Sequence, residues 1–570
     1  MKRFLFLLWL VLSASAACFA TDAVEDAYYI VGWKNEWSAL DKTYQLERLA
    51  DGLTWEITLP ADGDNGWFKI APESAYGHED FWGQLLYAPR DSCRELSGTM
   101  SRYSRGAWQL PNMEGVTSYR LRIVPSTMHF ELEPCYETEE TRISGTLPVL
   151  YLNTDQPVTL KTTYVKGSYY IDALGLEGYS DLGSAEDPLP LLIKGHGNWT
   201  WEGFDKKPYR LKLDHKAEPL GMRENRHFTL IANANDNMGY LRHTMGYELS
   251  RLMKLDYTPE QRPVEVVMNG QYIGLYMLTD KIRVGKNRVN IVEQENRETD
   301  PEKMTGGWLV EIDNYNAFNQ VRIQEPDGST LRITCHYPEI PSAAQWDYIC
   351  NLLKATDAAI NNPDKNSTEW EQYIDVEALA RYYVVQEVID DGEAFHGSCF
   401  MHKDRGNDTK LIFGPVWDFG NAYNSHYEKF IYVNPPFDQF WIGQIARFPR
   451  FQQQVRKAWQ TFLEEAYPHL EPFIDNFIAQ IETAADNDGR RWPAYSQGNM
   501  AKRRDYFKLR LKNKVDFLRQ QWGDIPAPIH CVTASDLTRD TWTTMDGRRL
   551  SAPPQRHGIY LRNRQIVVRE

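Results

Sequence analysis

Residues 192–201 read LIKGHGNWTW, and residues 206–213 read KKPYRLKL. Two glycines flank one histidine in the first segment, and such a backbone can bend closely around an anion and offer it N–H groups. The second segment alternates, so its arginine and its last lysine share one face of a strand. The two segments predict a phosphate-binding turn followed by a cationic strand. The residues assigned to this site are Gly195, Gly197, Asn198, Lys207, Arg210 and Lys212.

A helix and a hairpin are expected next. Residues 241–251 read LRHTMGYELSR and are expected to form a helix that carries Glu248. Residues 264–281 read VEVVMNGQYIGLYMLTDK, in which the Asn-Gly pair is typical of a tight turn between two antiparallel strands. The pattern therefore predicts a helix packed near a β-hairpin.

Two acidic segments follow in the C-terminal half. Residues 414–420 read GPVWDFG and place Asp418 in an Asp-Phe-Gly sequence, and residues 387–398 read EVIDDGEAFHGS. In phosphoryl transfer a carboxylate holds the Mg²⁺ that bridges the nucleotide phosphates. A second carboxylate can accept the hydroxyl proton. These segments are therefore the candidates for a metal site and for acid–base chemistry.

Taken together, these segments resemble the kinase family of spore coat protein H (CotH) over about residues 143–523. The resemblance implies an atypical protein-kinase fold, with a β-rich lobe at 143 to about 300 and a mostly helical lobe from about 340 to 525. A hinge is expected near residues 279–282. The resemblance also implies ATP with Mg²⁺ or Mn²⁺ as cofactors and a Ser/Thr protein as substrate.

The same resemblance implies roles for single residues. Asp418 is expected to hold the metal ion, and Ser398 to be a second metal ligand. Glu248 is expected to pair with a kinase lysine, and a surface position is the alternative. This chain departs from the family pattern at His196, which replaces an arginine, and at Trp199, which replaces a serine.

The most serious departure is Glu393, which stands where the family has its catalytic aspartate. Three interpretations stay open. Glu393 accepts the hydroxyl proton itself, Asp390 or Asp391 takes that role, or catalysis is lost.

Residues 22–135 predict an all-β domain, because short alternating runs are separated by clusters of Gly, Asp, Asn and Pro. The length suits a β-sandwich. The opening run YYIVGWKNEW resembles the sandwich domains of the starch-utilisation outer-membrane lipoproteins, which implies glycan binding. Trp33 and Trp37 are the carbohydrate-binding candidates, with Trp67 and Trp82 as further members of a sugar platform. Core packing is the alternative for these rings.

Both ends of the chain carry targeting signals. Residues 1–20 combine a basic start, an apolar run and a small-residue site, which is typical of a secretory signal peptide. Lipidation of Cys18 is an alternative fate for this end. Residues 526–570 resemble the sorting domains of the type IX secretion pathway, and a small β-module packed on the kinase-like domain is the alternative.

Composition excludes one class of partner. A net charge of -15 argues against nucleic acid, which needs an excess of Lys and Arg. After the first segment the chain has no run of ~20 apolar residues that would span a membrane. Cys93 and Cys135 are expected to form a disulfide after export. The basic helix at 502–514 is interpreted as a solvated face, with acidic-substrate binding as the alternative.

The sequence thus predicts a multidomain secreted or surface protein. Its parts are a signal peptide (1–20), an all-β sandwich (22–135), an α+β kinase-like domain (143–525) and a β tail (526–570). The predicted function is that of an atypical kinase that phosphorylates exported or surface proteins. The alternative is a catalytically degenerate kinase fold that acts as a surface structural or glycan-binding protein.

Overall fold

A computed structural model describes most of the chain. The described residues are 25–61, 66–82, 87–89, 93–102, 105–113, 116–136, 143–325, 328–424, 428–433, 441–524, 542–544, 549–550, 558–562 and 565–569. The expected signal peptide and Cys18 lie outside these residues. The chain divides into two compact units between Gly523 and Asp524.

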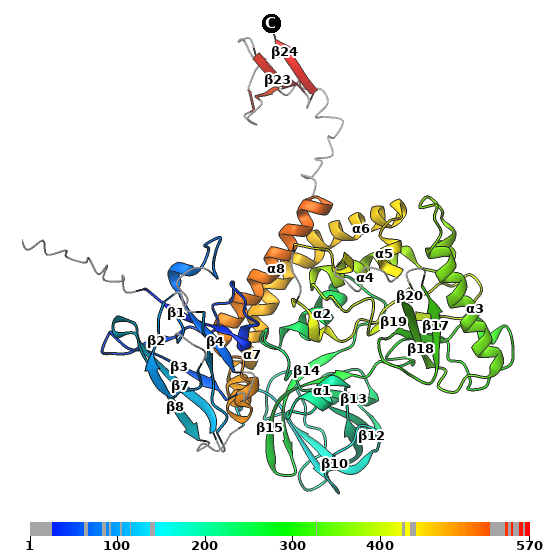
Figure 1. The fold of residues 1–570 in the computed structure, drawn as a ribbon. Coiled ribbons are helices and arrows are strands. Elements are labelled where there is room, and N and C mark those ends of the chain that lie inside the picture. Colours follow the sequence, from blue (N-terminus) through cyan, green and yellow to red (C-terminus); the bar gives the residue numbers. More distant parts are fainter. Residues whose placement is uncertain are drawn as a thin grey trace, which may run out of the picture. The chain divides into compact units, whose positions relative to one another are not determined.

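The N-terminal part of the first unit is a β-sandwich (Figure 1). One sheet has the order β1-β4-β6, with β1 (Tyr28–Gly32), β4 (Trp67–Pro72) and β6 (Trp108–Gln109). The other has the order β2-β3-β7-β8-β5, with β2 (Glu47–Arg48), β3 (Trp55–Pro60), β7 (Val116–Val124), β8 (His129–Tyr136) and β5 (Ser97–Thr99). Alternate residues of both sheets, such as Ile30 and Leu121, are fully buried between them. The predicted all-β domain is confirmed.

The next seven strands close into a barrel in the order β10-β11-β12-β13-β15-β14-β9 (Figure 1). They are β9 (Val149–Thr154), β10 (Val165–Asp172), β11 (Leu189–Gly195), β12 (Tyr209–Ala217), β13 (Asn225–Ile231), β14 (Gln261–Met268) and β15 (Gln271–Asp280). Leu211 and Leu213 point into the apolar interior, so the alternating Arg210 and Lys212 lie outside it. The predicted hairpin is confirmed: Asn269 and Gly270 both have positive φ between β14 and β15.

A second sheet and a set of helices complete the kinase-like domain. The sheet order is β17-β18-β16-β19-β20, with β16 (Trp308–Ile312), β17 (Gln320–Gln324), β18 (Thr330–Tyr337), β19 (Cys399–Lys403) and β20 (Ile412–Phe413). The helices are α1 (Trp199–Gly203), α2 (Leu241–Leu252), α3 (Ala343–Ile360), α4 (Val376–Val388), α5 (Trp441–Ile445), α6 (Pro449–Thr461), α7 (Tyr467–Arg491) and α8 (Met500–Trp522). The C-terminal lobe is thus mixed, because β19 pairs with β16 and extends the sheet.

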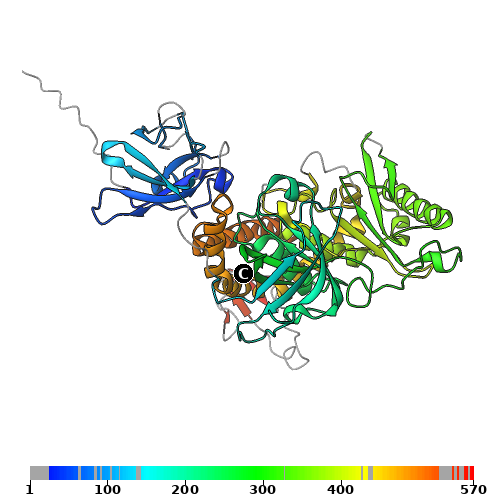
Figure 2. The ribbon, with the colours of Figure 1, turned by 90° about the horizontal axis from the view of Figure 1, so that it is seen from below.

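Helices α7 and α8 pack side by side, and α7 also packs on β15 (Figures 1 and 2). The interpretation of α8 as a helix with a solvated basic face holds for residues such as Lys512, which is 64% exposed, but is wrong for three other cations. Arg503 and Lys514 are completely buried, and Arg510 is nearly so. Buried cations need partners, and the partners come from distant segments that the local sequence does not reveal.

Lys514 holds the segment that follows α4. Its ammonium nitrogen lies 3.0 Å from an Asp390 carboxylate oxygen and 3.1 Å from one of Glu387. All three side chains are fully buried. Burial raises the pKa of Glu387 above its ordinary value, although the charge of Lys514 opposes that shift. The acidic segment near Glu393 is therefore anchored to α8.

The second unit contains a four-stranded sheet in the order β22-β21-β23-β24. Its strands are β21 (Trp542–Thr544), β22 (Arg549–Leu550), β23 (Gly558–Arg562) and β24 (Gln565–Arg569). The short strands expected in this tail are present. Its role in secretion stays a prediction.

The expected disulfide is not formed, because Cys93 and Cys135 are both free thiols. Cys93 pairs with Trp108 beside β6, whereas Cys135 lies on β8 of the opposite sheet. Within the described residues, no helix has both the length and the apolar character needed to cross a membrane.

Replacing Lys514 by Met tests the buried cluster. The change leaves two buried carboxylates without their cation, so we expect the free energy of unfolding to fall by about 3–5 kcal/mol. Lys512→Met is the matched control on the same helix: Lys512 is 64% exposed and pairs with Asp516, so its loss should cost less than about 0.5 kcal/mol. Urea denaturation measures both, and equal losses would contradict this role of Lys514.

Candidate active site

A cavity of about 580 Å³ lies where the barrel meets the C-terminal lobe. This size is typical of sites for small ligands and cofactors. Its wall is built from the turn after β11, the loop after β13, the end of β15, the β16 segment, and the loops that carry Glu393 and Asp418. The cavity thus joins segments that are far apart in the sequence.

The predicted turn forms one wall of this cavity. Gly197 has a φ of +79° and, like Asn198, faces the cavity. Gly195 lies behind them, where a Cβ atom would stand 2.5 Å from the ring of Trp201. Both glycines are therefore required by the backbone, one for its conformation and one for close packing. Burial and the nearby Lys281 charge lower the pKa of His196 to about 3, so this imidazole is neutral.

Two lysines line the cavity. Lys206 is paired with Asp488 at 2.8 Å, whereas Lys281, which the residue-based assignment missed, forms no ion pair among the described residues. Burial and the neighbouring charges of Arg210 and Lys194 lower the pKa of Lys281 to about 8. Its ammonium group lies 5.6 Å from the ring centre of Trp417. Lys194 and Arg210 face each other across β11 and β12. Three neighbouring cations favour an anion here, although Glu311 also lines the cavity and its charge acts to raise the pKa of Lys281. The sequence feature that could have identified Lys281 is its position directly after the apolar strand β15.

Other assigned cations lie elsewhere. The ammonium of Lys207 donates to the backbone oxygen of Trp201 at 2.7 Å, which supports the turn from behind. Lys212 lines a different cavity, with Asp214 among its neighbours. Glu248 bonds to Arg251 one turn along α2 and lines a third cavity. The structure therefore does not bring Lys212 or Glu248 to the candidate site.

Asp418 lines the same cavity, with 51% of its side chain exposed. Burial acts to raise the pKa of its carboxyl, but the nearby imidazole of His243 and the backbone N–H of Gly420 outweigh this effect and lower it. Asp418 also has a left-handed φ of 56°, a strained conformation that is commonly kept at functional sites. A carboxylate held ionised at a cavity wall can bind a cation.

The ring of Phe419, the residue after Asp418, packs against α2. A Cβ atom on Gly246 of α2 would lie 2.2 Å from this ring, so α2 needs a glycine where Phe419 packs. His243, one turn earlier on α2, lies 3.7 Å from Asp418. The helix thus supports both the aromatic ring and the carboxylate.

Glu393 lies beside Asp418 in the cavity wall. One of its oxygens accepts a hydrogen bond from Asn421, and the other accepts one from Asn314 at 3.1 Å. Burial and the charge of Asp418 raise the pKa of Glu393 above its ordinary value. This carboxyl is thus oriented by two amides and primed to take a proton.

Asp390 and Asp391 are placed less favourably for chemistry. Asp390 is committed to Lys514, and Asp391 is 1% exposed and accepts the backbone N–H of Glu393 at 3.2 Å. Burial and the charge of Glu393 hold the pKa of Asp391 well above its usual range. Ser398 lines the cavity and has a left-handed φ of 51°.

These residues fit a nucleotide-bound divalent cation rather than a resident structural metal. No group of three metal-ligating side chains occurs in the part of the chain that the structure describes. Mg²⁺ is usually held by one or two carboxylates together with substrate phosphates. Asp418 supplies such a carboxylate, and the carboxyl of Glu393 lines the same cavity.

Comparison with known families matches this geometry. The family described as "CotH kinase protein" matches residues 193–519. The chain belongs to the CotH kinase family. The match covers the cavity walls of this CotH protein, from β11 to most of α8. A second family, described as "SusF, first starch specific CBM", matches residues 23–134. No curated protein matches the chain closely enough to name a substrate.

The tryptophans predicted to form a sugar platform on the sandwich differ in their exposure. Trp37 and Trp82 are 36% and 51% exposed, with ring centres 6.2 Å apart. Trp33 instead packs against the sandwich core beside Phe68. The exposed pair is therefore Trp37 with Trp82, and Trp33 stands behind it.

The raised pKa of Glu393 predicts a pH dependence. Because the pKa of Glu393 is higher in the folded state than in the unfolded state, the folded state binds this proton more tightly. The stability that the proton provides is therefore lost as pH rises from the ordinary Glu pKa through the raised pKa of the folded state. Glu393→Gln removes the charge and should therefore raise the melting temperature at neutral pH but not below about pH 4. The control is Glu339→Gln, whose side chain is exposed and should show no such trend. Identical pH profiles for Glu393→Gln and wild type would contradict the assignment.

Proposed function

We propose that the protein transfers the γ-phosphoryl group of ATP to a Ser or Thr hydroxyl of an exported or surface protein. The observation that carries this proposal is a single cavity lined by both cationic and acidic groups. Lys281 and the glycine turn form the cationic wall, and Asp418 and Glu393 form the acidic one. Phosphoryl transfer needs both, because phosphates must be neutralised while a hydroxyl loses its proton.

The cationic wall is suited to the phosphates of the nucleotide. Gly197 brings its backbone to the cavity in a left-handed conformation, and Lys281 and Arg210 supply positive charge. The lowered pKa of Lys281 would rise when phosphates bind, because an opposite charge favours the ammonium form.

The acidic wall is suited to the metal and to the acceptor. Mg²⁺ or Mn²⁺ would be held by Asp418, with Ser398 as a further oxygen ligand, and would neutralise charge on the phosphates. Glu393 would accept the proton of the acceptor hydroxyl. The oxygen of that hydroxyl would bond to the γ-phosphorus as the bond from the γ-phosphorus to the leaving ADP oxygen breaks. Glu393 is preferred over Asp390 and Asp391 because it alone of the three lines the cavity.

The location proposed for this activity is outside the cell or at its surface. The match to a starch-binding module supports that location. The signal peptide, the lipid-anchored alternative at Cys18 and the sorting tail remain part of this proposal.

Two lysine variants test the nucleotide site. Lys281→Met should weaken Mg²⁺-ATP binding at least tenfold, because it removes a cation that lines the cavity. Lys212→Met is the matched control and should leave binding unchanged, since Lys212 lines another cavity. Calorimetric titration measures both, and a larger loss for Lys212→Met would contradict the assignment.

Glu393→Gln should retain binding while transfer of labelled phosphate to protein is lost.

A second function, glycan binding by the sandwich, is favoured by the exposed Trp37 and Trp82 pair. Aromatic side chains bring a large apolar surface to a contact. Glycan binding does not depend on catalysis. It is therefore also compatible with the alternative of a catalytically degenerate surface protein.

Retention on an α-glucan resin tests the second function. Trp37→Ala and Trp82→Ala should each weaken retention, because each removes one ring of the exposed pair. Trp33→Ala should instead lower the thermal stability of the sandwich, since Trp33 packs against Phe68. Full retention by the double variant Trp37→Ala, Trp82→Ala would rule out this platform.

A further inference from the structure

The loop after β1 joins the sandwich to the kinase-like domain. It begins with the short helix η1 (Trp33–Asn35), and its next two residues, Glu36 and Trp37, have left-handed φ values of 52° and 57°. Non-glycine residues adopt this conformation only where surrounding contacts enforce it. Trp37 belongs to the exposed aromatic pair, so one strained turn links the aromatic face to the domain contact.

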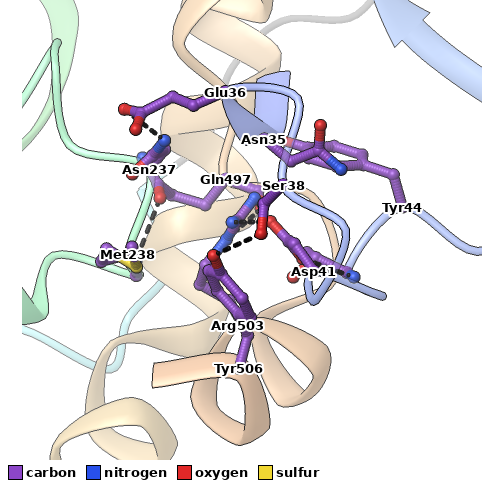
Figure 3. Close-up of polar contacts among 12 residues, drawn as sticks. Asn35, Glu36, Ser38, Asp41, Tyr44, Asn237, Met238, Gln497, Arg503 and Tyr506 are labelled. Atoms are coloured by element: carbon purple, nitrogen blue, oxygen red, sulfur yellow. Dashed lines mark hydrogen bonds and ion pairs between the residues drawn. The ribbon is translucent and has the colours of Figure 1, made fainter. Parts of the chain in front are cut away.

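Buried polar contacts fix this loop on α8 (Figure 3). Arg503 and Asp41 are both fully buried, with a nitrogen–oxygen distance of 2.9 Å. The Arg503 guanidinium also lies 5.2 Å from the ring centre of Tyr44, and the Tyr506 hydroxyl donates to Ser38 at 3.0 Å. Domains of one chain usually move relative to each other. A buried ion pair across this contact opposes such motion, because separation would leave a charge without its partner.

A second set of contacts runs from this loop toward Asp418. An oxygen of Glu36 accepts a hydrogen bond from Asn237 at 2.8 Å (Figure 3). The same oxygen lies 3.5 Å from the guanidinium of Arg242 on α2. Arg242 is 1% exposed, and Glu36 is the carboxylate within ion-pair distance of it among the described residues. A buried guanidinium thus takes its countercharge from the sandwich.

Arg242 passes this restraint to the segment that carries Asp418. One of its nitrogens donates to the backbone oxygen of Gly420 at 2.5 Å, and the other donates to Asn424 at 2.5 Å. The backbone N–H of Gly420 in turn donates to Asp418 at 3.4 Å. Gly420 is therefore held on both sides, by Arg242 through its oxygen and by Asp418 through its N–H.

We propose that Glu36 and Arg242 are positioning residues for Asp418, and that glycan binding at Trp37 is thereby coupled to metal–nucleotide binding. The coupling rests on the proposed function, whereas the positioning of the segment does not. Coupling between two sites is reciprocal. A glucan that favours the docked loop should therefore favour the bound nucleotide, and the nucleotide should favour the glucan.

Hydrogen exchange of the full-length protein tests the positioning without any nucleotide. Glu36→Ala should speed exchange in residues 418–424, because Asn237 and Arg242 lose the oxygen that accepts from them. Glu36→Gln keeps an acceptor oxygen and should restore most of the protection. Glu47→Ala, an exposed change on β2 of the same sandwich, is the control and should leave the segment unchanged. Equal exchange in wild type and Glu36→Ala would overturn the positioning role.

Calorimetry then tests the coupling. Glu36→Ala should weaken Mg²⁺-ATP binding by about two- to thirtyfold, the range for mutations that alter coupling between sites, and should leave metal-free ATP binding unchanged. Maltoheptaose should tighten Mg²⁺-ATP binding by wild type but not by Glu36→Ala. If wild type binds no Mg²⁺-ATP while exchange responds to Glu36→Ala, the proposed function falls and the positioning stands. If maltoheptaose changes neither affinity nor exchange in wild type, the coupling is overturned.

Discussion

The buried pairing of Lys514 with Asp390 and Glu387 is the interaction on which the candidate site depends. A buried charge is tolerated only with a partner, so α8 and the segment after α4 must fold together. That segment leads directly to Glu393 and Ser398. The position of two cavity residues is therefore set by a helix that lies more than a hundred positions further along the chain.

The same helix uses a second buried cation for a different purpose. Arg503 pairs with Asp41 of the sandwich. One end of α8 thus holds the N-terminal domain, and its middle holds the loop that leads to Glu393. The two functions suggested for this chain, phosphoryl transfer and glycan binding, consequently share one structural support. A sandwich that served only as a tether would not need such contacts with the CotH domain.

Local sequence patterns predicted the parts of the site that depend on nearby residues. The turn at Gly197 and the hairpin at Asn269 follow from backbone conformation, and Asp418 was found from the short motif around it. Lys281 was missed because it faces the cavity only after β15 pairs with β13, which is a long-range contact. Arg503 and Lys514 were misinterpreted for the same reason, since a buried cation and a solvated one look alike in a basic helix.

His196 stands where the family has an arginine, and this replacement changes the charge of the turn at residues 195–198. Burial beside Lys281 keeps this imidazole neutral, so positive charge at this wall comes from Lys281 and Arg210. Glu393 is longer than aspartate, and the two amides of Asn314 and Asn421 hold its extra length in place. These two departures from the family pattern thus have neighbours that accommodate them.

A crystal structure with Mn²⁺ and a non-hydrolysable ATP analogue tests the central claim most directly, because anomalous scattering locates the metal. The account predicts a Mn²⁺ ion bonded to Asp418 and to phosphate oxygens, with Lys281 beside the same phosphates. A nucleotide bound away from this cavity, or Mn²⁺ without contact to Asp418, would contradict it.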